Sequence, residues 1–355
     1  MDIAVPAFIM EALKTRADHP YFGYFYLDHR YYDSIIRWQA ERNDVHGLTK
    51  ENIIFENGVL GALDAALEAF TLPGDKVLLQ TPGYHQFKNC INNHGRVVCG
   101  TPLKQVDGIY RMDFEDMEQK IVENNIKLTV LCSPHNPTGR VWDRKELEQF
   151  VEVCYRHNVL ILSDEIHSDL ILTDRPFVAT QAVSEHAKKI TIALCAPSKT
   201  FNLAGLGSSY AIVYDPELAQ TYQKASTLYH YNSYNAMSIE AAVTAYEKGA
   251  EWVDELRDYL RGNMRLVCST FEKKCPNIKA YVAEATYLMW VDFSGTGLTQ
   301  EEIKDRCING AGVIIHDGMT FIEGGDGFMR MNIACPRALV EEAVLRLCDA
   351  FQLAQ

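Results

Sequence analysis

The sequence reads Ser198-Lys199-Thr200-Phe201-Asn202-Leu203-Ala204-Gly205-Leu206 shortly after an apolar, β-rich run at 190–195. A lysine therefore stands just past the end of a predicted buried strand. In an open α/β sheet, ligands bind outside the carboxyl ends of the strands. This placement makes Lys199 the leading candidate for a reactive centre, at the edge of such a sheet.

Two further strand ends carry side chains of matching chemistry. Cys132-Ser133-Pro134-His135-Asn136-Pro137-Thr138-Gly139 follows the run at 127–131, and Ser163-Asp164-Glu165-Ile166-His167 follows the run at 159–162. A lysine, an asparagine and an aspartate at three strand ends suggest an aldehyde cofactor, pyridoxal phosphate, bound to the lysine as a Schiff base.

The composition favours a large folded core and argues against two classes of partner. The chain has 355 residues, and 47% of them are hydrophobic, which suits one substantial domain with a satellite. Its net charge of -13 argues against nucleic acid, because phosphate backbones require basic patches. No apolar run approaches the roughly 20 residues of a membrane helix, and no charged-then-apolar leader opens the chain at Met1. We therefore expect a soluble, cytoplasmic protein with no membrane partner.

The ten cysteines form no C-x-x-C pair and mostly lie inside apolar patterns. Such scattered cysteines are typical of reduced core residues, and we expect no metal site. Cys132 and Cys195 lie close to the proposed site, where a functional thiol is the alternative to a small buried hydrophobe.

Strands and helices alternate through the middle of the chain, a pattern typical of a parallel sheet with crossover helices. We expect strands at 53–55, 76–80, 96–99, 127–132, 159–163, 191–195 and 209–213, and helices at 60–70, 85–93, 114–123 and 144–157. Asp143 and Glu146 have the spacing of a capping box at the start of the last of these helices. After Pro216 the pattern turns helical, at 217–228, 238–247 and 252–274.

From about Ile278 onward, short strands and helices mix. We expect strands at 279–282, 287–293, 313–315 and 328–333, and helices at 300–309 and 337–351. The predicted fold class is α/β: a three-layer, mostly parallel sheet in a large domain at 20–255, with a smaller α+β domain formed by 1–19 and 256–355. A helix at 6–16 is expected to pack onto the small domain.

Lys199 and Asp164 have the central chemical roles. Lys199 is predicted to hold the cofactor aldehyde, to exchange it for the substrate amine and then to remove the α-proton. Asp164 is predicted to pair with the pyridine nitrogen and keep it protonated, so that the ring can withdraw electrons. The structural alternatives are an exposed loop lysine and an aspartate that caps a helix.

Asn136 and His167 follow the other two motifs. Asn136 is predicted to donate to the phenolic oxygen of the cofactor, and its alternative is turn chemistry, since Asn-Pro is itself a turn signal. His167, three residues after Asp164, is expected near the same oxygen or above the ring. A hydrogen-bonded structural histidine is the alternative there.

The cofactor phosphate needs backbone donors at the start of a helix together with hydroxyl groups. The turn at Gly58, Val59 and Leu60, which leads into an apolar-periodic helix, is predicted to supply the backbone donors, and Ser198 a hydroxyl. Tyr84, after another strand end, is placed to stack on the pyridine ring, with an interfacial packing role as its alternative.

Three motifs taken together resemble a known family: Ser133-Pro134-His135-Asn136-Pro137-Thr138-Gly139, Ser163-Asp164-Glu165-Ile166-His167 and Ala196-Pro197-Ser198-Lys199-Thr200-Phe201-Asn202. They look like the pyridoxal-phosphate-dependent fold-type I, class I/II aminotransferase superfamily, which is aspartate aminotransferase-like in fold. More narrowly, they look like its cystathionine β-lyase subgroup, the PatB/MalY-type C-S lyases. The resemblance runs over essentially the whole chain.

The resemblance adds roles for two residues and shows two departures. It implies that Arg330, with Asn136, binds the substrate α-carboxylate. It also implies a homodimer with shared active sites, in which Tyr24 of the partner subunit reaches the cofactor phosphate. The family commonly has a tyrosine where this chain has His167, and a phosphate-binding arginine where it has Gly207, so the phosphate site must differ.

The resemblance also implies a reaction. A lyase of this subgroup cleaves L-cystathionine or related cysteine thioethers, or cysteine, to pyruvate, ammonia and a thiol by β-elimination. An aminotransferase, which moves the amino group between an amino acid and a 2-oxoacid, is the alternative because both reactions use Lys199 as the base. The subgroup motifs favour the lyase. A transcriptional regulator is disfavoured, because no basic DNA-binding segment lies between Met1 and the first helix.

Overall fold

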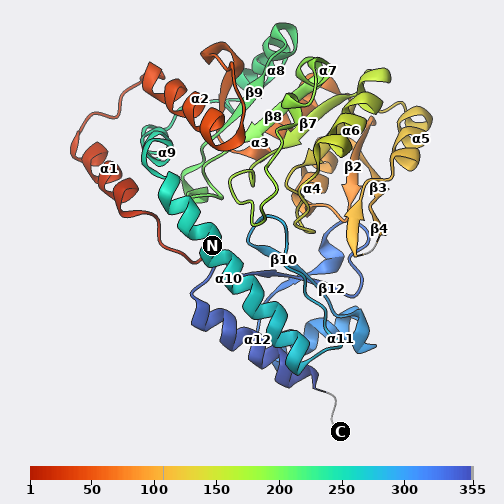
Figure 1. The fold of residues 1–355 in the computed structure, drawn as a ribbon. Coiled ribbons are helices and arrows are strands. Elements are labelled where there is room, and N and C mark those ends of the chain that lie inside the picture. The colour runs from red at the N-terminus through yellow and green to blue at the C-terminus, as the bar shows by residue number, and fades with distance from the viewer. Residues whose placement is uncertain (107, 353–355) are drawn as a thin grey trace.

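A seven-stranded sheet forms the centre of the computed structural model, which describes residues 1–106 and 108–352 (Figure 1). The strands lie in the order β1-β9-β8-β7-β6-β2-β3. Their bounds are β1 (Ile53–Glu56), β2 (Lys76–Thr81), β3 (Val97–Pro102), β6 (Leu128–Cys132), β7 (Leu160–Asp164), β8 (Thr191–Cys195) and β9 (Ser209–Val213). β9 pairs antiparallel with both β1 and β8, and the other pairs are parallel. The predicted mostly parallel α/β sheet is confirmed.

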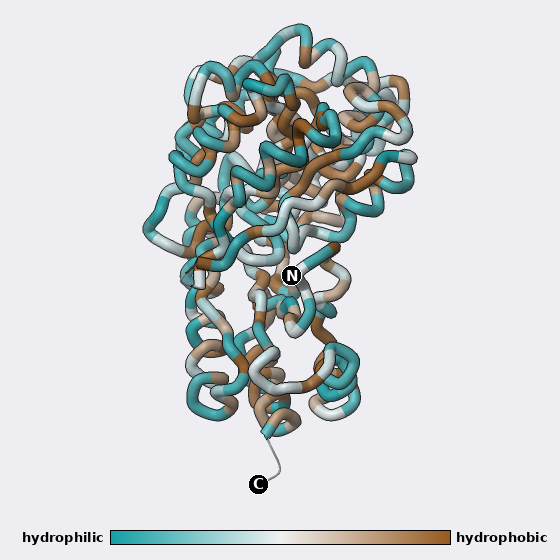
Figure 2. Tube along the Cα trace, turned by 90° about the vertical axis from the view of Figure 1, so that its right-hand side faces the viewer, coloured by the Kyte–Doolittle hydropathy of each residue, from teal (hydrophilic) through white to brown (hydrophobic). Residues whose placement is uncertain are grey.

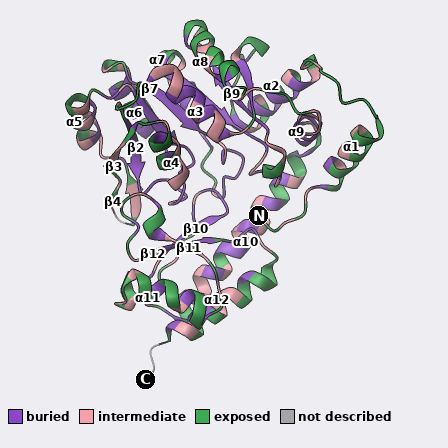
Figure 3. Cartoon of the chain, turned by 180° about the vertical axis from the view of Figure 1, so that it is seen from behind, coloured by how far each residue is buried: buried purple, intermediate pink, exposed green. Residues whose placement is uncertain are grey.

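Helices cover both faces of this sheet and make it the middle of three layers. One face packs against α3 (Val59–Phe70), α4 (His85–Asn93) and α8 (Pro216–Leu228), and the other against α5 (Phe114–Asn124), α6 (Arg144–Arg156) and α7 (Glu185–Ile190). Adjacent residues of β2 show the alternation, since Leu78 belongs to one apolar cluster and Leu79 to the other. Apart from the edge strand β3, which is mostly partly exposed, the strands of this sheet are almost wholly buried (Figure 3), and the hydrophobic segments lie in the interior (Figure 2).

The predicted capping box at the start of α6 is present. Asp143 accepts from the Glu146 backbone N–H at 2.9 Å, while its own N–H donates to Glu146 at 3.0 Å. Two otherwise unpaired backbone donors are thereby satisfied, which fixes where this helix begins.

A second, three-stranded sheet lies below the first in the view of Figure 1. Its order is β10 (Leu288–Asp292), β12 (Phe328–Asn332), β11 (His316–Asp317), all antiparallel. The helices α10 (Ala250–Lys274), α11 (Gln300–Asp305) and α12 (Arg337–Phe351) share one apolar core with it. Short 3₁₀ turns at Lys50–Asn52, Thr180–Ala182, Ala204–Leu206, Ser294–Thr296 and Gly318–Thr320, and a π-helical turn at Arg306–Gly310, complete the connections.

The N-terminal helix lies elsewhere than expected. α1 (Ala7–Asp18) packs on α9 (Ala236–Lys248), and its buried Ile9 joins the core of the large sheet, so the prediction that it packs onto the small domain is wrong. Only Met1 and Ile3, ahead of the helix, pack against the core of the three-stranded sheet.

Five other local expectations need correction. The sequence reasoning missed α2 (His29–Asn43), α7 and the hairpin of β4 (Lys104–Val106) with β5 (Ile109–Arg111). The strand expected at 279–282 is reduced to one isolated bridge, between Lys279 and Asp292, and the chain that follows is unpaired, with Tyr281 and Val282 exposed. The strand expected at 313–315 is extended chain without strand pairing, and pairing begins only at β11.

No helix within residues 1–106 and 108–352 is both long enough and apolar enough to cross a membrane.

Candidate active site

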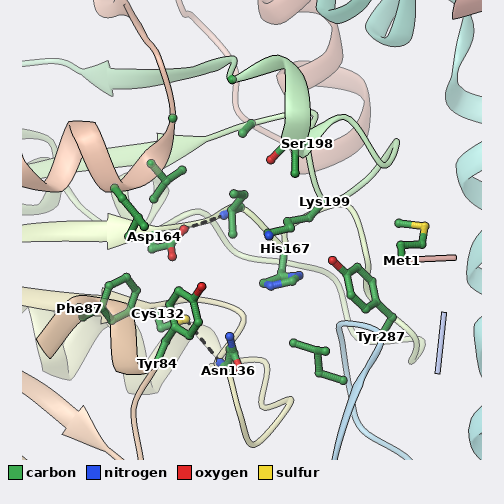
Figure 4. A pocket seen from close by; sticks show the side chains of 18 of the residues that line it. Met1, Tyr84, Phe87, Cys132, Asn136, Asp164, His167, Ser198, Lys199 and Tyr287 are labelled. Carbon is green, nitrogen blue, oxygen red and sulfur yellow. Dashed lines mark hydrogen bonds between the residues drawn. The ribbon is translucent and has the colours of Figure 1, made fainter. Parts of the chain in front are cut away.

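The carboxyl ends of the central strands open into a cavity of about 550 Å³ (Figure 4). Residues from the ends of β6, β7 and β8, from the start of α3 and from β10 and β12 line it. Every predicted site residue except Tyr24 is among them: Gly58, Val59, Leu60, Tyr84, Asn136, Asp164, His167, Ser198, Lys199 and Arg330. The two sheets therefore meet at one polar cavity. Tyr24 lies in an extended segment between α1 and α2 and is fully exposed.

Lys199 reaches the cavity from the turn that follows β8. Two bonds hold this turn in place: the Phe201 N–H donates to the Pro197 carbonyl at 2.9 Å, and the Thr200 hydroxyl donates to the buried Asp169 carboxylate at 2.8 Å. Burial lowers the pKa of the Lys199 amine, Asp164 opposes that shift, and the charge of Arg330 adds to it. A lysine with a lowered pKa carries more neutral amine near pH 7, the form that acts as a nucleophile or base.

Asp164 ends β7 and is buried. The Ile166 backbone N–H donates to its Oδ1 at 3.2 Å. Burial raises the pKa of the Asp164 carboxyl to about 6, while the Ile166 hydrogen bond and the Lys199 charge oppose this rise. A buried carboxylate with spare acceptor capacity is suited to pairing with a protonated ring nitrogen.

Arg330, on β12, lies next to Asn136, and both line the cavity. Its Nη1 donates to Asn136 Oδ1 at 2.8 Å, and its guanidinium carbon lies 4.7 Å from the centre of the Phe321 ring. Burial lowers the pKa of Arg330 to about 10, and Tyr84 and Tyr287 oppose that shift, so the guanidinium stays charged at neutral pH. The result is a fixed, buried cation at the side of the cavity formed by the small sheet.

His167 and Tyr84 add aromatic surface to the cavity. Burial, then the charges of Lys199 and Arg330, lower the pKa of His167 to about 3, so this imidazole is neutral. Its buried Nδ1 has no hydrogen-bond partner within the described residues. Tyr84 is half-buried and packs edge-on against Phe87, with 5.5 Å between ring centres.

The start of α3 forms the end of the cavity that suits an anion. Gly58 precedes the helix with a φ of 138°, a conformation open to glycine, and no side chain caps the helix. The N–H groups of the first turn are therefore available to a negatively charged group, next to Ser198. Gly207, which stands where the family commonly has an arginine, also lines the cavity, and an added Cβ there would lie 3.2 Å from the Asn57 carbonyl oxygen.

Sequence reasoning missed several residues that line the cavity, among them Met1, Ser208, Tyr287 and Asn332. Tyr287 and Asn332 reach the site only because β10 and β12 meet the large sheet at this edge, and no local pattern signals that contact.

Comparisons with known proteins agree on one family. The family model for aminotransferase class I and II matches residues 2–347. The chain is 38% identical to cystathionine β-lyase PatB of Bacillus subtilis (strain 168), over 98% of this chain and 89% of that protein. It is 30% identical to protein MalY of Escherichia coli (strain K12), over 99% of this chain and 90% of that protein.

Solved structures extend this likeness to the fold and the cofactor. Cystalysin from Treponema denticola, a structure that contains pyridoxal 5'-phosphate, has a TM-score of 0.95 at 32% identity, covering 99% of this chain and 89% of its own. The pyridoxal-phosphate-bound C-S lyase from Staphylococcus hominis has a TM-score of 0.92 at 30% identity, covering 99% of this chain and 90% of its own.

Proposed function

Because the chain belongs to the class I and II aminotransferase family, we propose that it is a pyridoxal-phosphate-dependent C–S β-lyase. It cleaves L-cystathionine or a related cysteine thioether, or cysteine, to pyruvate, ammonia and a thiol. The observation that carries this proposal is one cavity holding Lys199, Asp164, Asn136 and Arg330, in a chain most of whose length matches a cystathionine β-lyase. Aminotransferases are the weaker alternative, since a curated relative of that class is 26% identical.

The residues present fit pyridoxal phosphate, the cofactor found in solved relatives. The buried Asp164 carboxylate has acceptor capacity left for a ring N–H, and the uncapped start of α3 has N–H groups left for a phosphate. His167, whose buried Nδ1 has no partner among the described residues, lines the same cavity. We therefore assign Lys199 to the aldehyde, Asp164 to the ring nitrogen and the turn at Gly58, Val59 and Leu60, with Ser198, to the phosphate.

Asn136, Tyr84 and His167 complete the assigned cofactor contacts. The Asn136 amide would donate to the phenolic oxygen, and Tyr84 would stack on the ring. His167, which stays neutral, would lie above the ring or near the same oxygen. Together these residues would hold the ring in one orientation, with Lys199 within reach of the reacting carbon.

The cofactor supplies an aldehyde carbon that takes up an amino group and a ring that withdraws electrons from the substrate Cα. Lys199 Nζ, whose pKa is lowered by burial, takes the Cα proton when it is in its neutral form and holds it beside the substrate. The C–S bond then breaks and the sulfur leaves with the electron pair, to be protonated to the thiol. In sum, the thioether and one water give pyruvate, ammonia and a thiol.

Arg330 orients the substrate for that step. Its planar guanidinium can bind the α-carboxylate with two parallel N–H bonds, and Asn136 shares the position by accepting from Nη1. The carboxylate is thereby held at the side of the cavity away from α3, so that the Cα proton faces Lys199.

The family resemblance also supports proposals for the oligomeric state and the cellular location of the protein. We infer a homodimer with shared active sites, in which Tyr24 of the partner subunit reaches the cofactor phosphate; full exposure of Tyr24 in the single chain supports this. We also propose a cytoplasmic enzyme with neither nucleic acid nor membrane as partner. The division into a large domain at 20–255 and a small domain of 1–19 with 256–355 stays a proposal; of 1–19, Met1 and Ile3 pack against the small-sheet core, whereas α1 packs on α9.

Pyruvate release from L-cystathionine tests the proposal. The wild-type protein loaded with pyridoxal phosphate should absorb visible light and release pyruvate, and Lys199→Ala should lose both. Lys224→Ala, an exposed lysine on α8, is the matched control and should keep both. A colourless wild type after addition of the cofactor, or unimpaired pyruvate release by Lys199→Ala, would contradict the assignment.

A further inference from the structure

Two groups from different parts of the chain hold the guanidinium of Arg330. Nη1 donates at 2.8 Å to Oδ1 of Asn136, in the turn after β6, while Nη2 lies 2.6 Å from His316 Nδ1, on β11. The ring of Phe321 lies against the face of the guanidinium at 4.7 Å. Two bonds in its plane and a ring on its face fix the orientation of Arg330 and leave further N–H groups for a carboxylate.

The His316 contact requires one particular form of the imidazole. A guanidinium can only donate, so His316 Nδ1 must present a lone pair, which places the ring proton on Nε2. A protonated imidazole carries hydrogen on both nitrogens and cannot accept this bond. The antiparallel register pairs His316 directly with Arg330, so the backbone keeps the two side chains together.

Few charged groups compete for His316. Arg330 faces it from β12, and His85 faces it from α4 with 6.2 Å between ring centres. The next residue, Asp317, turns to Lys304 of α11, with 3.6 Å between carboxylate oxygen and amine nitrogen. His316 is itself exposed, but partial desolvation on the side that faces the protein, and then the charge of Arg330, lower its pKa, so the neutral form prevails at neutral pH.

We propose that His316 is a positioning residue that holds Arg330 in the orientation that binds the substrate carboxylate, and that it releases this hold when it is protonated. The inference rests on the proposed role of Arg330 and adds to it a proton-linked control of substrate binding. Substrate affinity is highest at pH values at which His316 is neutral, and it declines as the pH falls and His316 becomes protonated. The protonated imidazole no longer accepts a hydrogen bond from Arg330 and instead places a second positive charge beside it.

Propionate is the probe for this control. It offers a carboxylate but no amine, so it can engage Arg330 without exchanging with Lys199. Its dissociation constant is measured by calorimetry on the cofactor-loaded protein near pH 7.5 and near pH 4.5, the lower value being needed because the pKa of His316 is lowered below that of an ordinary histidine. Protonation of propionate itself affects all the proteins equally.

Three variants give distinct expectations. Wild type should bind propionate about tenfold more weakly at the lower pH than at the higher one, beyond the effect of propionate protonation. His316→Asn keeps a hydrogen-bond acceptor that does not titrate, so this extra weakening should be absent. His316→Leu should bind propionate about tenfold more weakly than wild type near pH 7.5, and should show no excess weakening at the lower pH, because the acceptor is gone at both pH values. His85→Asn, the matched control, should keep the wild-type pH dependence, since His85 does not bond to Arg330. Thermal unfolding midpoints verify that each variant is folded.

Equal pH dependence in wild type and His316→Asn would overturn the proposal, as would wild-type affinity in a folded His316→Leu. Pyruvate release is measured beside binding. If propionate binding depends on pH as expected but no pyruvate is released, the role of His316 would be supported and only the proposed lyase reaction would be contradicted. Failure of propionate to bind wild type at either pH would overturn the clamp and the inference with it.

Discussion

Replacing Asp164 with asparagine should stabilise the cofactor-free protein while disabling the site. The wild-type carboxylate is buried, and the only hydrogen bond it accepts from the described residues is that of the Ile166 N–H. Asparagine keeps an oxygen that can accept this bond but carries no charge to desolvate. The same change removes the acidic partner that keeps the cofactor ring protonated, so stability and function should move in opposite directions.

The magnitude follows from the carboxyl pKa. Burial raises the pKa of Asp164 from 3.8 to about 6, and at about 1.4 kcal/mol for each pH unit its ionisation costs the folded state about 3 kcal/mol. Because the folded-state pKa is the higher one, this cost is absent below about pH 4 and complete above about pH 6. The new amide N–H₂ offsets about 1 kcal/mol, so about 2 kcal/mol should remain near pH 7.5.

Thermal unfolding of the cofactor-free protein measures this gain. In a chain of this size, Asp164→Asn should raise Tm by about 3 °C near pH 7.5 and by little near pH 4.5. The exposed Asp18→Asn is the matched control and should shift Tm at neither pH. With the cofactor present the order should reverse, because wild type gains more from binding it. A variant less stable than wild type at pH 7.5 without cofactor, or a gain independent of pH, would refute the reasoning.

Three further changes have defined outcomes. Arg330→Lys replaces a planar two-bond donor with a point charge and should lower kcat/KM by about 100-fold in a steady-state assay; a change under about threefold would contradict the carboxylate clamp. Ser198→Ala should raise the Kd of pyridoxal phosphate about tenfold in a fluorescence titration, since it removes a charge-assisted bond; an unchanged Kd would exclude Ser198 from the phosphate site. Gly139→Ala should lower Tm, at a cost of about 2 kcal/mol, because φ there is 71° and the new Cβ would lie 2.5 Å from that of Ala283; a Tm equal to wild type would contradict this.

The sequence predicts the central sheet well because its strands are buried on both faces. β6, β7 and β8 appear as short continuous apolar runs, and their ends carry the polar motifs. Lys199, Asp164 and Asn136 were predictable for this reason, since each follows such a run.

The missed elements depend on contacts that no local pattern shows. α2 buries Tyr31, Ile35, Trp38 and Gln39 at helical spacing, but its many charged and aromatic residues hide that apolar stripe. The apolar run at 313–315 predicted a strand, yet Ile314 is 83% exposed and pairing begins one residue after the run.

The site residues that sequence reasoning missed share this cause. Tyr287 lies beside the small sheet and lines the cavity, and His316 contacts Arg330 because the register of that sheet pairs the two residues across β11 and β12. Sequence spacing of 14 residues between that pair gives no sign of the contact. Tertiary pairing, not local propensity, builds this half of the site.

The central claim is tested most directly by whether pyruvate formation depends on an added 2-oxoacid, the amino-group acceptor of a transaminase. The cofactor-loaded protein is given L-cystathionine with and without an added 2-oxoacid, and pyruvate, ammonia and thiol are measured together. The β-lyase account predicts that the three products appear in equal amounts and that the oxoacid changes nothing. Product formation that depends strictly on the added oxoacid, with no release of thiol, would contradict the account and assign the chain to amino transfer.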